Sequence, residues 1–178
     1  GSVYLTCRTF GGCGGIVEAN GGNKAVNHSG GGAGGRIAVH YDAAAQEQVA
    51  PFPTVALSAI PGTPGSLGRG VGDLGTICLP DTQLLSDTLR FSGQLIVPGW
   101  TGWDTGNLRL ANVWTRIPVD GFDLNIAGEL AVGGVGGRLE LGGTENVIHS
   151  PRVGDAIWNI FNTVAGCTLS CANLVVTN

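Results

Sequence analysis

The chain has 178 residues, of which 43% are hydrophobic and only 12% are charged. This length supports one hydrophobic core or two small ones, and the apolar fraction argues against a disordered chain. The formal net charge is -4 and the nine basic residues are scattered, which excludes nucleic acid and anionic membranes as expected partners.

The glycine-rich first part predicts short strands joined by tight corners. In chain order, the strands are expected at residues 2–7, 15–19, 36–41 and 53–59. One short helix is expected in residues 42–50, with Asp42 as its N-cap and Pro51 ending it. The Gly- and Pro-rich residues 61–73 predict a loop. The expected organisation is therefore a segment 1–60, a loop 61–74 and a β-ladder segment 75–178 that continues the first.

Residues 88–143 show the clearest strand pattern, since pairs of large apolar residues stand two positions apart. The pairs are Leu89 and Phe91, Leu95 and Val97, Leu108 and Leu110, Leu124 and Ile126, Leu130 and Val132, and Leu139 and Leu141. Residues between them, such as Arg109, Asn125 and Glu140, are mostly polar or small, so most runs are expected to turn one face to water. Further strands are expected at 75–79, 88–91, 146–149, 156–161, 164–169 and 173–177.

The apolar pairs return roughly every 16 to 22 residues, which is typical of one coil of a β-solenoid. Shorter steps, such as Leu124 to Leu130 to Leu139, also fit a β-sandwich. The predicted fold class is all-β, with a solenoid resembling a parallel β-helix favoured over the sandwich.

The segments GSVYLTC, ANGGN, GGGAGGRIAVHYD, DLGTICLPD and ELAVGGVGGRLELGG resemble the glycine-rich repeats of very large secreted bacterial surface proteins. Those proteins are similar to parallel β-helix adhesins. The resemblance implies an extracellular stalk or scaffold of stacked coils, without a cofactor.

Cysteine usage gives a second indication of location. The chain has five cysteines and no CxxC pair, which favours an oxidising compartment over a metal site and predicts a secreted or cell-surface protein. Cys7 and Cys13 bracket a turn and are candidates for one disulfide, whereas Cys167 and Cys171 pair only if the chain turns between them. Cys78 is the odd cysteine, either buried and inert or bridging to another chain.

Other candidate sites are few. The three histidines come with no recognisable catalytic signature, and no metal site or cofactor is predicted. Asn27 begins a formal N-glycosylation sequon. No run is long and apolar enough for a membrane-spanning helix, and the first residues do not have the pattern of a signal peptide.

A polysaccharide-binding or polysaccharide-cleaving solenoid is the alternative function, because such proteins carry acidic pairs and aromatic platforms on one face. The candidate residues for that face are Trp100, Trp103, Trp114, Asp120 and Asp123, with Asp104 and Glu129 on flanking runs. Aspartate next to glycine also favours turns, and this simpler interpretation is preferred for Asp104 and Asp120.

The preferred function follows from the two ends of the strand pattern. It begins at Val3 and continues to Thr177 without a helix or a charged cap at either end. Open strand edges are templates for pairing with another chain. We therefore expect a non-enzymatic extracellular structural module, either a segment of a larger array or a subunit that polymerises head to tail.

Overall fold

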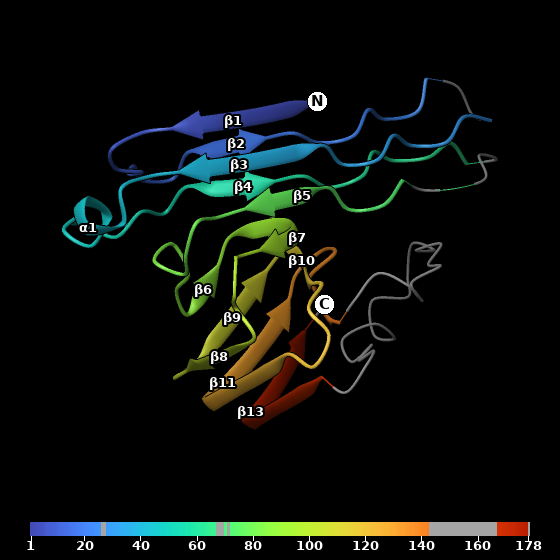
Figure 1. Cartoon of the computed structure of the whole chain (residues 1–178). Coiled ribbons are helices and arrows are strands. Elements are labelled where there is room, and N and C mark those ends of the chain that lie inside the picture. The colour runs from blue at the N-terminus through green and yellow to red at the C-terminus, as the bar shows by residue number, and fades with distance from the viewer. Residues whose placement is uncertain (26–27, 67–69, 71, 143–166, 178) are drawn as a thin grey trace. The chain divides into compact units, whose positions relative to one another are not determined.

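The computed structural model describes residues 1–25, 28–66, 70, 72–142 and 167–177 (Figure 1). The chain divides into two compact units. The first unit contains Gly1–Leu84 and Phe91–Val97, and the second contains Leu85–Arg90 and Pro98–Asn178. The described residues are rich in strands and contain almost no helix, and the strand registers of both units are parallel, which confirms the all-β prediction.

In the first unit, a row of parallel strands brings together segments far apart in the sequence. Its strands are β1 (Ser2–Thr6), β3 (Arg36–His40), β5 (Thr76–Cys78) and the second half of β7 (Phe91–Ile96). We call these strands the first row. Aliphatic side chains lie in register across it, from Val3 through Ile37 and Ile77 to Leu95. The last three are fully buried, so the core of this unit lies along such ladders.

A second row of parallel strands in the same unit consists of β2 (Ile16–Glu18), β4 (Ala56–Ser58) and the first half of β7. β7 therefore belongs to both rows, since Phe91 pairs with Leu57 whereas Leu95 pairs with Ile77. Along β7, the chain passes directly from the second row into the first.

Glycine-rich loops connect the second row to the first in the earlier layers. There the backbones lie against one another and exchange hydrogen bonds: the amide of Gly21 donates to the Ile60 carbonyl at 2.8 Å, and that of Lys24 donates to Thr63 at 2.8 Å. Donors three residues apart match the threefold repeat of an extended polyproline-II-like chain. A Cβ at Gly62 would lie 2.0 Å from the Gly22 carbonyl oxygen, so this close approach requires glycine.

The short helix α1 (Ala43–Gln46) lies between the first-row strand β3 and the second-row strand β4. As predicted, Asp42 is its N-cap, and the carboxylate accepts a hydrogen bond from the Ala45 amide at 3.1 Å. The buried Gln46 anchors the helix, because its side-chain amide accepts from the Phe10 amide at 2.7 Å and donates to the Phe10 carbonyl at 2.9 Å.

The second unit is also built from parallel pairs. Its strands are β6 (Thr88–Leu89), β8 (Gly102–Thr105), β9 (Leu108–Ala111), β10 (Trp114–Ile117), β11 (Asp123–Gly133), β12 (Arg138–Leu141) and β13 (Thr168–Thr177). β11 pairs with β13 along both halves, while on its other edge the first half pairs with β8 and the second half with β9. β6 pairs with β9, and β10 pairs with β12.

The predicted strands are found in the described part of the chain, most of them shortened at their ends. The described parts of two expected strands, 164–169 and 173–177, belong to the single strand β13, and residues 164–166 lie outside the described residues. The expected strands 146–149 and 156–161 lie outside the described residues. Glu140 is an exception to the water-facing position expected for most residues between the apolar pairs. It is 3% exposed, because Arg116 on the neighbouring strand neutralises its charge.

Candidate functional site

The outer edge of β13 is the first candidate site. Leu174 and Val176 on β13 are each 42% exposed, although their register partners on β11, Leu130 and Val132, are 0% and 2% exposed. Val175, whose side chain points to the opposite face, is also exposed. The aliphatic ladder of the second unit therefore ends in a layer that no described residue covers.

The edge strand β1 has the same character. Val3 and Leu5 are half-buried, whereas their partners on β3, Ile37 and Val39, are fully buried. Tyr4 points the other way and is 70% exposed, with its ring centroid 5.0 Å from that of His40. Each of these edge strands pairs on one side only among the described strands.

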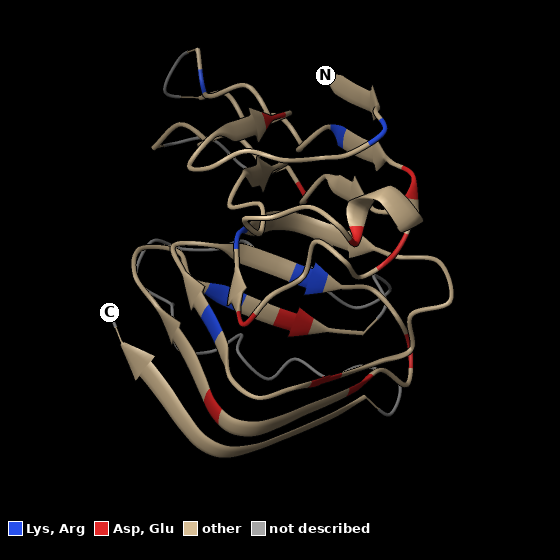
Figure 2. Cartoon of the chain, turned by 90° about the vertical axis from the view of Figure 1, so that its left-hand side faces the viewer, with Lys and Arg blue, Asp and Glu red and all other residues tan. Residues whose placement is uncertain are grey.

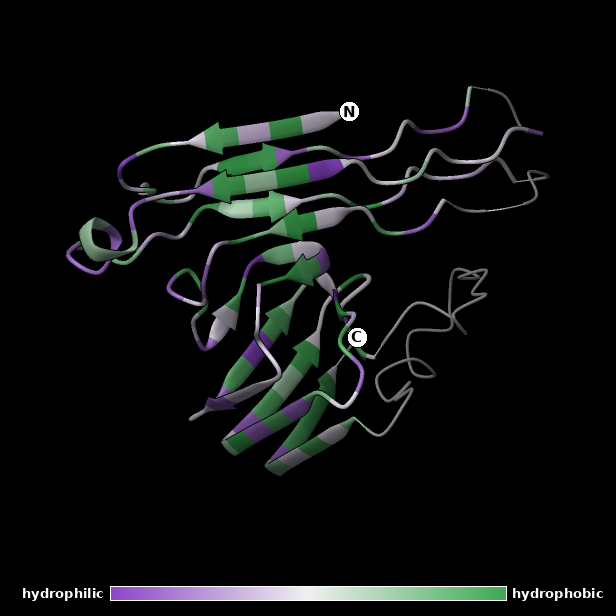
Figure 3. Cartoon of the chain, viewed as in Figure 1, coloured by the Kyte–Doolittle hydropathy of each residue, from purple (hydrophilic) through white to green (hydrophobic). Residues whose placement is uncertain are grey.

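Both edge strands lack the charged side chains that usually protect such edges. Figure 2 shows β1 and β13 free of Lys, Arg, Asp and Glu. Figure 3 shows apolar residues alternating with more polar ones along β1, whereas the second half of β13 has three consecutive aliphatic residues, Leu174, Val175 and Val176. Unpaired backbone donors and acceptors beside alternating aliphatic side chains can accept another parallel strand.

A polar face on β8, β11 and β13 is the second candidate. The Asn125 side chain donates to the Asp104 carboxylate at 3.0 Å and accepts from the Ser170 hydroxyl at 2.7 Å. The Thr168 hydroxyl likewise donates to Asp123. These exposed groups are in register across three strands, so they form a flat hydrogen-bonding surface.

A hollow of about 310 Å³ in the second unit is lined by Asp87, Arg109 and Glu129 among others. It combines two carboxylates with one guanidinium, a set that can bind sugar hydroxyls or a small polar ligand. The sequence pattern identified Glu129 but missed Asp87, because the β6–β9 pairing that places Asp87 beside this hollow joins segments about twenty residues apart.

The tryptophans predicted for a sugar-binding face lie in different surroundings. Trp100 is 8% exposed and packs against Phe122 at 4.8 Å and Trp103 at 5.7 Å between ring centroids. Trp103 is in register with the buried Leu124, so the two side chains point to the same face of the sheet. This orientation explains why Trp103 packs in an aromatic cluster. Asp120 is exposed in the turn before β11, consistent with the preferred turn interpretation.

Trp114 belongs to a polar cluster on β10 and β12. Its indole N–H donates to Glu140 Oε1 at 2.9 Å, while Arg116 Nε donates to Glu140 Oε2 at 2.6 Å. The Arg138 guanidinium lies 4.7 Å above the Trp114 ring, a cation–π geometry. Arg116 and Glu140 are 2% and 3% exposed, so this is a buried ion pair.

Tyr41 has a pKa displaced from its ordinary value. Burial, then the hydrogen bond that its hydroxyl donates to Asp81, and then the negative charge of that carboxylate all raise the pKa of Tyr41. The contact joins the end of the first-row strand β3 to the turn after β5. It is thus a link between neighbouring layers.

Neither candidate disulfide is formed, and none of the five cysteines takes part in a disulfide within the chain. Cys167 directly precedes β13 and Cys171 lies within that strand, so extended chain with no turn separates them. Four residues of extended chain span about 13 Å, well beyond disulfide reach. The Cys167 thiol donates instead to the Val119 carbonyl at 3.3 Å, and Cys7 donates to the His40 carbonyl at 3.6 Å. Cys13 is exposed and the odd Cys78 is half-buried.

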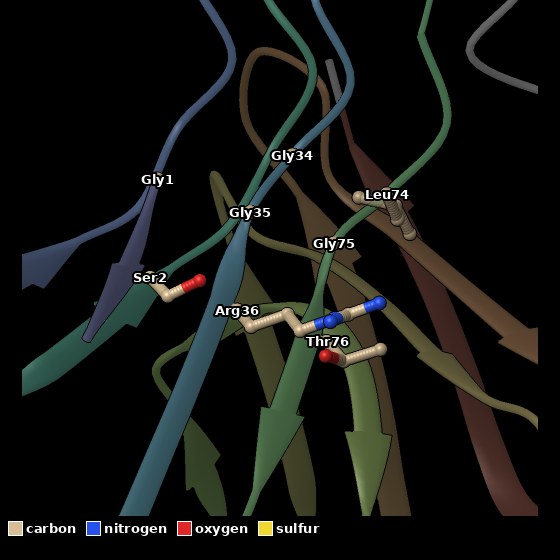
Figure 4. A pocket seen from close by; sticks show the side chains of 8 residues that line it. All are labelled: Gly1, Ser2, Gly34, Gly35, Arg36, Leu74, Gly75 and Thr76. Atoms are coloured by element: carbon tan, nitrogen blue, oxygen red, sulfur yellow. The ribbon is translucent and has the colours of Figure 1, made fainter. Parts of the chain in front are cut away.

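A further hollow of about 360 Å³ opens where β1, β3 and β5 begin. Figure 4 shows Ser2, Arg36 and Thr76 beside it, next to the glycine backbones of Gly35 and Gly75. Among the residues the structure describes, no three His, Cys, Asp or Glu gather as metal ligands, and no helix is long and apolar enough to cross a membrane. Asn27 lies outside the described residues.

Comparisons with family models, curated proteins and solved structures found no match.

Proposed function

We propose that this chain is a non-enzymatic structural module of β-solenoid type that assembles through its open strand edges into an extracellular fibre, stalk or scaffold. The parallel pairing supports the solenoid, because a chain that returns to the same row with the same direction must coil. Ser2 pairs with Arg36 and Arg36 with Thr76, so the row gains one strand at each return of the chain.

The observation that carries this proposal is the exposed last layer of the second unit. Leu174 and Val176 extend a ladder whose previous members are completely buried, and they lie on an uncharged edge. Covering such side chains is worth about 25 cal/mol for each Å² of apolar surface removed from water. Another strand on this edge would gain that energy and pair the free backbone groups together.

Sedimentation velocity over a concentration series tests the proposal. The wild-type chain should form larger species as its concentration rises, and Val176→Lys should keep it monomeric because a charge would enter the stacked layer. Val135→Lys is the matched control, since Val135 is 94% exposed and lies outside the strands.

A wild-type chain that stays monomeric at the highest concentration would overturn the proposal. Equal loss of assembly in Val176→Lys and Val135→Lys would also contradict it, because the effect would then come from added charge rather than from the β13 edge.

Carbohydrate binding remains the second candidate, favoured by the hollow that holds Asp87 and Glu129. A glycan array should then show binding that Asp87→Asn and Glu129→Gln each weaken about tenfold. Trp103→Ala and Trp114→Ala test whether the tryptophans take part. Absence of binding to every glycan would reject this candidate.

A further inference from the structure

We infer that the strand completing β13 is β1 of a second copy of this chain, seated on the second half of β13 so that Val3, Tyr4 and Leu5 lie beside Leu174, Val175 and Val176. This inference rests on the proposed assembly through strand edges. It adds the identity of the partner and the register of the contact.

The choice of the second half follows from the exposure of its aliphatic side chains. β13 pairs with the two halves of β11 on either side of a register irregularity. On the second half, Leu174 and Val176 are each 42% exposed, whereas Leu169 and Cys171 on the first half are half-buried. The second half therefore offers β1 the larger uncovered apolar surface.

The register follows from the alternation of side chains. Val3 and Leu5 point to the same face as the buried Ile37 and Val39, and Leu174 and Val176 point to the same face as the buried Leu130 and Val132. Pairing Val3 with Leu174 places both aliphatic pairs in one layer. A shift by one residue would turn the aliphatic residues of one strand to the opposite face, and a shift by two would leave one uncovered.

The outward face fits the same register. Tyr4 would lie beside Val175, and both are exposed in the single chain. Their neighbours within the chain are the small residues Ala38 and Ala131, which leave room for the tyrosine ring. The flanking pairs, Ser2 with Asn173 and Thr6 with Thr177, are polar and uncharged, so no like charges meet.

Disulfide trapping between copies tests the register. The test variant carries Tyr4→Cys and Val175→Cys, in a chain where Cys7→Ser, Cys13→Ser and Cys171→Ala remove competing thiols. Neighbouring strands lie about 4.8 Å apart, close enough for a disulfide between facing residues. The matched control carries Tyr4→Cys with Ser170→Cys, an exposed outward position on the first half of β13.

Both variants are prepared as equal mixtures of nitrogen-15-labelled and unlabelled chains, oxidised mildly, digested and analysed by mass spectrometry. We expect linked peptides with one labelled and one unlabelled partner from the test variant, at least tenfold more than from the control. Sedimentation of the same samples under reducing conditions measures assembly separately.

Assembly without this excess of mixed linkage would overturn the proposed register while leaving the proposed function standing. Linkage found solely between peptides of the same label would place both strands in one chain, and would also overturn it. Absence of assembly in the reduced samples and in the wild type would instead reject the proposed function itself.

Discussion

At the residue scale, Arg116 and Glu140 form a buried ion pair in the second unit. Both side chains lie on paired strands, and Trp114 donates a further hydrogen bond to the carboxylate. The cost of removing two charges from water is offset here because the carboxylate has a partner at each oxygen. Removing one charge leaves the other unpaired in the interior.

Glu140→Gln should therefore lower the free energy of unfolding by about 3 to 5 kcal/mol, measured by urea denaturation. Glu129→Gln, at a less buried position in the same unit, should change it by less than about 0.5 kcal/mol. Similar effects of the two substitutions would contradict the role assigned to the buried pair. The double variant Arg116→Met with Glu140→Leu should be far less damaging than Glu140→Gln.

Tyr41 gives a prediction about alkaline pH. Its pKa is raised in the folded protein, so the unfolded chain loses the phenolic proton first as the pH rises. The stability that this proton contributes is complete below the ordinary tyrosine pKa of about 10 and is lost at higher pH. Denaturation between pH 8 and 11 should show unfolding free energy falling above about pH 10, and Tyr41→Phe should flatten that fall. An unchanged slope in the variant would contradict the assignment.

At the element scale, the glycine-rich loops of the first unit pack as backbone against backbone. Gly62→Ala places a methyl group about where the Gly22 carbonyl oxygen lies, so several kcal/mol of stability or the fold itself should be lost. Gly22→Ala is the matched control, because its Cβ would meet no atom within 4 Å. Thermal unfolding should show a large loss for the first variant and little change for the second. Equal losses would contradict close backbone approach as the reason for glycine at residue 62, because alanine lowers the entropy of the unfolded chain at both positions.

The helix and the strands also show which features of the fold local sequence patterns can predict. Asp42 and Pro51 bracket the short helix correctly because capping depends on residues a few positions apart. The aliphatic pairs at Leu124, Leu130 and Leu139 likewise lie in strands with buried side chains. The same alternation did not predict the burial of Glu140. A polar residue between two apolar ones is expected to face water, and the local pattern cannot reveal that a buried arginine pairs with it on the next strand.

At the scale of the whole molecule, assembly should couple to stability. Association of folded chains shifts the unfolding equilibrium by mass action, so the midpoint of thermal unfolding should rise with protein concentration. Calorimetry across a hundredfold range of concentration measures this rise. Val176→Lys should remove the concentration dependence, whereas Val135→Lys should keep it. A midpoint independent of concentration in the wild type would argue against assembly.

The sequence by itself determined that the fold is all-β, that one short capped helix forms and that both edge strands are uncharged. These features follow from the alternation of side chains, from capping and from charge, which are local properties of the chain. The tertiary structure alone decided which strands are neighbours. It placed Asp87 beside Glu129, enclosed Trp100 against Phe122, joined Arg116 to Glu140 and formed no disulfide among the five cysteines. These outcomes depend on parallel registers between segments 20 to 45 residues apart, and no local pattern encodes the register of a distant strand.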